Sequence, residues 1–150
     1  MNKHFDRIEG SDFMTKQDRD DFARYCYVYS KHIESMFGRF DWDNKEFIHF
    51  CKTNIIQKKG NKIGGKNKNH FWFMASKPKG AKANDFAHHF LRHIRNAFAH
   101  GQIEVSYKGK NRCKFYTLKD FDPQGVQSMG GYIRSDLLWQ MVWLLYQTRR

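Results

Sequence analysis

The sequence NDFAHHFLRHIRNAFAHG, residues 84–101, has the pattern of one amphipathic helix. Its apolar residues recur at steps of three and four and form one broad face, which predicts that this helix packs on the core. Asn84 is a suitable N-cap, and Asp85 would lie at the positive end of the helix dipole. Gly101 marks the expected helix end, because glycine adopts the left-handed turn that follows many helices without strain.

The remaining faces of this predicted helix are basic and rich in imidazole. At about 100° per residue, the polar side chains divide into two neighbouring groups. One stripe carries His89, His93, Asn96 and His100, and the next sector carries His88, Arg92 and Arg95. Such a face is often only solvated surface. We interpret His88, His89 and Arg92 as auxiliary contacts to RNA phosphates.

Arg95 and His100 combine a phosphate-binding group with a group that transfers protons. Arginine stays charged and its planar fork matches phosphate geometry. Histidine titrates near neutral pH and serves in general acid–base catalysis. Asn96, one turn from His100, would orient His100 or the phosphate. RNA carries its own nucleophile, the 2′-OH, so these residues predict RNA cleavage without a metal.

The geometry of a single helix separates the two main groups. Arg95 and His100 project about 140° apart on a straight helix, which is a poor arrangement for one phosphate. A second copy of the chain, related by a two-fold axis, would bring its own residues alongside and form a composite cleft.

Arg95, Asn96 and His100, with Ala99 before and Gly101 after the histidine, resemble the motif of the HEPN superfamily. That motif is an arginine, a polar residue, three further residues and a histidine near a helix end. The hairpin-like segment and apolar last helix that follow are similar to those of smaller bacterial members. The resemblance implies a homodimer with the two motifs in one cleft. Many members are metal-independent endoribonucleases, several of them toxins, while others only bind.

The predicted function is therefore a metal-independent endoribonuclease, a toxin or antiphage effector that cleaves RNA through attack by the 2′-OH. Arg95 would bind the phosphate and His100 would be the general acid or base. The expected partners are RNA, a second copy and an antitoxin protein, with no cofactor. The alternatives are a non-catalytic module that binds RNA, a nucleotide or a protein through the same basic face, and an interaction subunit assembled through its last helix.

Metal binding by the same helix is the weaker interpretation. His89 and His93 have the i, i+4 spacing of zinc ligands. No acidic residue or cysteine near them in the sequence completes a ligand set. We therefore predict no metal site.

Length and composition favour a single domain over residues 1–150 with a substantial core, since aromatic residues make up 17% of the chain. No run approaches the roughly eighteen apolar residues of a membrane span, and the first residues lack the apolar region of a signal peptide. Cys26, Cys51 and Cys113 are widely spaced and odd in number, which indicates reduced thiols and a cytoplasmic location. The net charge of +12 indicates a polyanionic partner, with nucleic acid first.

The basic charge is concentrated in one stretch of the chain. Between Glu46 and Asp85 there are nine lysines and no acidic residue. Within this lysine-rich stretch, residues 70–76 include three successive aromatic side chains. These rings could stack on RNA bases, but they are better explained as part of a short buried helix. The lysines that we predict to contact RNA are Lys58, Lys59, Lys62, Lys66 and Lys68.

The other expected elements complete a mainly α fold. A first helix begins at a capping box of Thr15 and Asp18, and its apolar stripe continues to Phe40. Asp43 would cap a second helix. Strands at 103–107 and 113–117 form a hairpin, residues 121–131 a loop, and residues 132–147 a last helix that is apolar on nearly all sides. We therefore predict a HEPN-like helical bundle with a small β-hairpin before the last helix.

Overall fold

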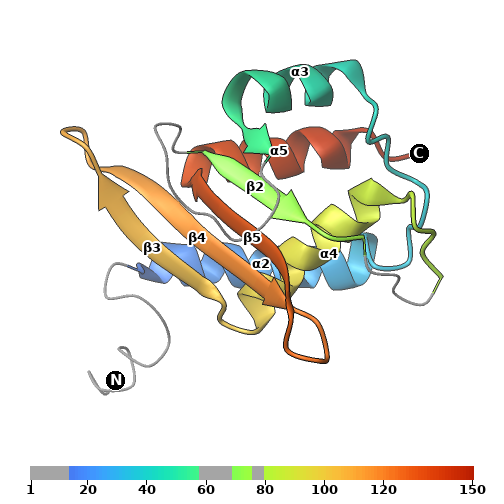
Figure 1. Ribbon diagram of the computed structural model, residues 1–150, viewed down its shortest axis with the longest axis horizontal. Coiled ribbons are helices and arrows are strands. Elements are labelled where there is room, and N and C mark those ends of the chain that lie inside the picture. Colours follow the sequence, from blue (N-terminus) through green and yellow to red (C-terminus); the bar gives the residue numbers. More distant parts are fainter. Residues whose placement is uncertain (1–13, 58–68, 76–79) are drawn as a thin grey trace.

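The computed structural model describes residues 14–57, 69–75 and 80–150, in which helices cover one face of a five-stranded sheet (Figure 1). The helices are α2 (Lys16–His32), α3 (Lys45–Asn54), α4 (Phe86–Ala99) and α5 (Ser135–Gln147). The strands are β1 (Ile56–Gln57), β2 (His70–Phe73), β3 (Ile103–Lys108), β4 (Cys113–Phe121) and β5 (Gln127–Arg134). Helices α4 and α5 contact the sheet, α2 packs on α4, and α3 packs on α5.

The predicted mainly α bundle is wrong, because the sheet is a major part of the fold. Strands β3, β4 and β5 form an antiparallel meander, and β2 adds to it antiparallel to β5. The short β1 pairs parallel to β2, so the order is β1-β2-β5-β4-β3. The predicted hairpin exists as β3 and β4, but the architecture is mixed α and β.

Two strands occupy segments for which we expected a helix and a loop. Strand β2 is an aromatic run, and such residues suit the pleated, half-buried surface of a sheet. Strand β5 contains Gly130 and Gly131, a pair that indicated a loop in the sequence. In the sheet these glycines lie opposite Trp72 and Phe71 of β2. They provide space for the two rings, since a Cβ at Gly131 would lie 2.6 Å from the Phe71 ring.

We expect Gly131→Ala to destabilise the protein by about 1–3 kcal/mol, the usual cost of overpacking a filled interior. The Phe71 ring is buried and would have to shift with the backbone that it packs against. Urea unfolding measures the effect, and Lys119→Ala on the exposed side of β4 is the control. Equal stability of Gly131→Ala and wild type would show that the ring is not confined there.

Several helix boundaries agree with the sequence patterns and others differ by one or more residues. Helix α2 begins at the predicted capping box, with the Asp18 backbone N–H donating to Thr15 Oγ1 at 3.1 Å. It ends at His32, earlier than predicted, although the apolar stripe continues in buried Phe40. The N-caps of α3 and α4 are Asn44 and Asp85, each one residue later than predicted. Gly101 has φ +67, as expected for the residue after a helix.

The core lies between the sheet and its helical layer, as Figure 1 shows. Helix α4 contributes its predicted apolar face, with Phe90, Leu91 and Ile94 inaccessible to solvent. Most apolar side chains of α5 are also used within the protomer, and only Trp143 among them is largely exposed, at 56%. Among the described helices, none combines the length and apolar character needed to cross a bilayer.

Candidate functional site

The predicted motif lies at the C-terminal end of α4, where the helix meets the surface. Arg95 and Asn96 are half-buried on the last turns, and His100 is the exposed C-cap residue. The His100 backbone N–H donates to the Asn96 carbonyl oxygen at 3.0 Å, and the left-handed turn at Gly101 directs the chain away. The imidazole of His100 is therefore presented to solvent at the helix end.

Arg95 is held in place by its neighbour and by α2. Its Nη1 donates to Asn96 Oδ1 at 2.9 Å, and its guanidinium carbon lies 5.8 Å from the centre of the Tyr29 ring. The contact with Asn96 engages one of several guanidinium donors. The others can bind a phosphate while this contact sets the direction of the group.

Asp120 is a buried residue in contact with the motif that the sequence interpretation missed. It lies on β4, is only 3% exposed, and accepts a hydrogen bond at Oδ2 from Asn96 Nδ2 at 3.1 Å. Its other oxygen accepts from the Phe121 backbone N–H at 2.9 Å. A signal was available in the alternation of β4, where Tyr116, Leu118 and Asp120 all face inward. A carboxylate in that register must be paired inside the protein.

His93 supplies that pairing from α4. Its Nδ1 lies 2.7 Å from Asp120 Oδ2, and its Nε2 lies 2.7 Å from the Met74 carbonyl oxygen. Both oxygens are acceptors, so each ring nitrogen of His93 is placed to donate. Burial raises the pKa of Asp120, but the hydrogen bonds from His93 and Asn96 and the charge on His93 lower it more, leaving the pKa below its ordinary value of 3.8.

A sequence model of the family described as HEPN pEK499 p136 matches residues 22–148. The chain belongs to this HEPN family. The match confirms the resemblance carried by Arg95, Asn96 and His100. No curated protein and no solved structure matches the chain significantly.

The three residues of α4 that we predicted as RNA contacts in this HEPN domain are less exposed than His100. His88 and His89 are buried, and their Nε2 atoms each lie 3.0 Å from a backbone carbonyl oxygen, those of Glu34 and Lys82. In this conformation neither ring is positioned to contact RNA. Arg92 is half-buried beside His93, and its phosphate contact stays a prediction. The predicted contacts Lys58, Lys59, Lys62, Lys66 and Lys68 lie outside the described residues.

The buried imidazoles give an expected dependence of stability on pH. Burial lowers the pKa of His88 and His89 below 6.5, more than their hydrogen bonds to backbone carbonyls raise it. The unfolded chain then binds more protons, so this stability is complete above about pH 6.5 and is lost as the pH falls toward the folded values. We expect the urea-derived unfolding free energy to decrease from about pH 7.5 to 5. His88→Phe should show a shallower decrease, and stability that is constant or rises over this range would contradict the assignment.

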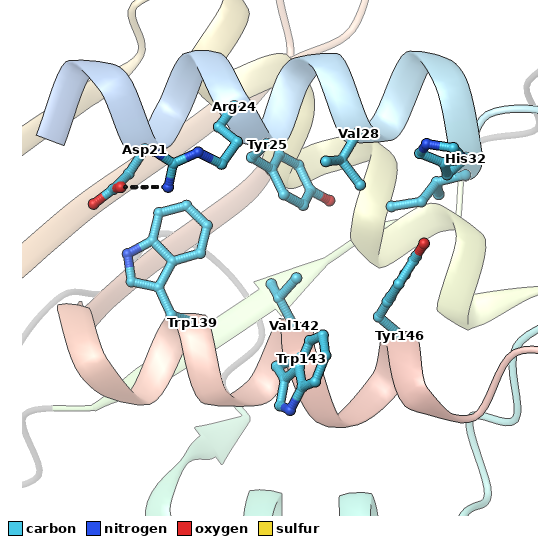
Figure 2. A pocket seen from close by; sticks show the side chains of 10 residues that line it. Asp21, Arg24, Tyr25, Val28, His32, Trp139, Val142, Trp143 and Tyr146 are labelled. Carbon is cyan, nitrogen blue, oxygen red and sulfur yellow. Dashed lines mark hydrogen bonds and ion pairs between the residues drawn. The ribbon is translucent and has the colours of Figure 1, made fainter. Parts of the chain in front are cut away.

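A separate apolar pocket of this HEPN domain lies between α2 and α5 and has a volume of about 490 Å³. Figure 2 shows side chains of the two helices meeting across it, with the Asp21–Arg24 ion pair at one end. On α2 it is lined by residues such as Val28, whereas Cys26 faces α4 and contacts the Arg95 carbonyl. These two positions project about 160° apart. The pocket is therefore on the side of α2 away from the motif.

Proposed function

We propose that this HEPN domain is a metal-independent endoribonuclease, with Arg95 as phosphate ligand and His100 as proton-transfer group. The observation that supports it best is the pairing of an arginine oriented by Asn96 with an exposed imidazole at the end of α4. A planar guanidinium stabilises the charge that develops on phosphate, and an exposed imidazole exchanges protons near neutral pH. We further propose a role as toxin or antiphage effector in the cytoplasm, with an antitoxin as a protein partner.

The reaction needs only the substrate, these side chains and water. The 2′-OH oxygen attacks the neighbouring phosphorus, and the bond from phosphorus to the 5′-oxygen of the next nucleotide breaks. The proton of the 2′-OH is lost and the leaving 5′-oxygen gains a proton. His100 makes one of these transfers and water makes the other. The products are a 2′,3′-cyclic phosphate and a 5′-hydroxyl.

A homodimer is part of the proposal, with Arg95 of one protomer and His100 of its partner acting on one phosphate. The two residues project in different directions from α4, which argues against one phosphate between them in a single protomer. Two apolar side chains near the motif are exposed, Met74 at 55% and Phe121 at 41%. The Met74 carbonyl contacts His93, and the Phe121 backbone N–H contacts Asp120. A second copy seated on these two side chains would therefore lie against the motif.

The direct test is incubation of purified protein with RNA in EDTA. Wild-type protein should cut RNA and leave 2′,3′-cyclic phosphate ends, while DNA of the same sequence, which lacks the nucleophile, should stay intact. Cleavage that requires an added metal, or equal cleavage of DNA, would contradict the mechanism.

Binding of RNA should depend steeply on salt. The chain carries a net charge of +12, and each phosphate that a basic side chain neutralises releases condensed counterions. With about five phosphates contacted, affinity for single-stranded RNA should fall about 100-fold between 50 and 200 mM salt. Fluorescence anisotropy of a labelled RNA measures this, and an affinity that does not change with salt would exclude an electrostatic interface.

A binding-only HEPN module is the second candidate, and the pocket between α2 and α5 favours it. The pocket is lined largely by apolar and aromatic side chains and lies apart from the motif, as expected for a ligand-binding pocket. Salt-sensitive binding of RNA without cleavage, in a confirmed dimer, would support this candidate over the ribonuclease.

A further inference from the structure

We propose that His93 and Asp120 form a positioning unit that acts through Asn96 to set the direction of the Arg95 guanidinium. The effect on catalysis rests on the proposed ribonuclease function, whereas the effect on Arg95 itself does not. Neither His93 nor Asp120 faces the phosphate site, so both act through another residue.

The hydrogen bonds of this unit determine which way the Asn96 amide is turned. His93 Nε2 donates to the Met74 carbonyl at 2.7 Å, and His93 Nδ1 donates to Asp120 Oδ2 at 2.7 Å. Asn96 Nδ2 donates to the same Asp120 oxygen at 3.1 Å. Because the Asn96 nitrogen is turned to the carboxylate, its oxygen is turned to Arg95 and accepts from Nη1 at 2.9 Å.

The unit is rigid because it joins three elements inside the protein. Asp120 belongs to β4, His93 and Asn96 to α4, and Met74 follows β2 directly. His93 is 0% exposed and Asp120 is 3% exposed, so water does not compete for these bonds. A buried carboxylate whose two oxygens both accept hydrogen bonds holds its geometry better than an exposed one.

The carboxylate is needed in this position, and the amide of the same shape does not replace it. In Asp120→Asn the substituted amide has one acceptor oxygen, and the backbone N–H of Phe121 requires it. The NH₂ group of that amide would then face Asn96 Nδ2, so the Asn96 amide must turn over and present its nitrogen to Arg95. The guanidinium would lose its acceptor although nothing in the site changed in size.

The experiment compares Asp120→Asn, Asn96→Ala and a matched control, Asp18→Asn. Asp18 is also a buried carboxylate, 1% exposed, and accepts from Lys114 and Tyr116 near the opposite end of β4. The Asp18→Asn substitution removes this carboxylate and so disturbs a comparable polar cluster away from Arg95. Asn96 is half-buried, so Asn96→Ala should fold even if Asp120→Asn does not.

The first readout is the ¹⁵N–¹H spectrum of the Arg95 guanidinium, which needs no activity. We expect the ordered Arg95 signals to broaden or exchange faster in Asp120→Asn and Asn96→Ala, and to persist in Asp18→Asn. Unchanged Arg95 signals in Asn96→Ala, or in a folded Asp120→Asn, would overturn the proposal. This arm stays decisive even if the wild-type protein cuts no RNA, which would refute the proposed function alone.

The second readout is the kinetics of RNA cleavage. A misplaced phosphate ligand should lower kcat about 10–100-fold in Asn96→Ala and Asp120→Asn, with a smaller change in KM. Asp18→Asn should retain kcat to within about threefold, because it leaves the reacting groups in place. Equal losses of kcat in Asp18→Asn and Asp120→Asn would reduce His93 and Asp120 to a structural role and overturn the proposal.

Discussion

His100→Ala is expected to lower the rate of RNA cleavage about 10²–10⁴-fold, the usual contribution of a general acid or base. Arg95→Ala should lose a comparable factor, because the charge that develops on the phosphate is no longer stabilised. His100 is exposed and Arg95 half-buried, so both variants should keep the fold. Rates are measured in EDTA under single-turnover conditions, with circular dichroism as the test of folding.

The control for these variants is His49→Ala, a histidine of α3 outside the motif, which should retain the wild-type rate. His93 would be an unsuitable control because it contacts Asp120 inside the protein. Cleavage that survives both His100→Ala and Arg95→Ala would show that the end of α4 is not the site.

Purified heterodimers of Arg95→Ala with His100→Ala should recover about half of the wild-type activity, although each homodimer is nearly inactive. If a site takes Arg95 from one protomer and His100 from its partner, such a heterodimer contains one intact site and one that lacks both residues. Co-expression with two affinity tags supplies the mixed species, and sedimentation checks that it is a dimer.

The reciprocal heterodimer makes the test sharper. Wild type paired with the Arg95→Ala, His100→Ala double variant should be nearly inactive, because each shared site then lacks one residue. Half activity in this pair, with none in the first, would place both residues of one site in the same protomer. A monomer at tens of micromolar would contradict the shared site, since a specific interface of ordinary size is populated there.

Local patterns predicted the helices well because each is determined by residues close in sequence. The capping box at Thr15 and Asp18, the apolar face of α4 and the turn at Gly101 all depend on spacings of a few residues. The strands β2 and β5 were missed because each depends on the other. An aromatic run and a glycine pair fit together only across a sheet, and no pattern within either segment shows that.

The site shows the same division between local and distant information. The family match extends over Arg95, Asn96 and His100, whose spacing along one helix is visible in the sequence. The partners of Asn96 and His93 are not, because Asp120 lies 24 residues beyond Asn96 and Met74 lies 19 residues before His93. The histidines of α4 also look alike in sequence, and only the fold shows which oxygens each ring contacts.

Asp18 has a consequence for the way the protein is made. Its carboxylate accepts hydrogen bonds from Lys114 and Tyr116, which lie 96 and 98 residues further along the chain. Contacts this distant form late, because the loop between them must close first. During translation α2 therefore stays unanchored at its N-terminal end until β4 has left the ribosome exit tunnel. Asp120 emerges with the same strand, so a nascent chain that already displays Arg95 and His100 still lacks the assembled site.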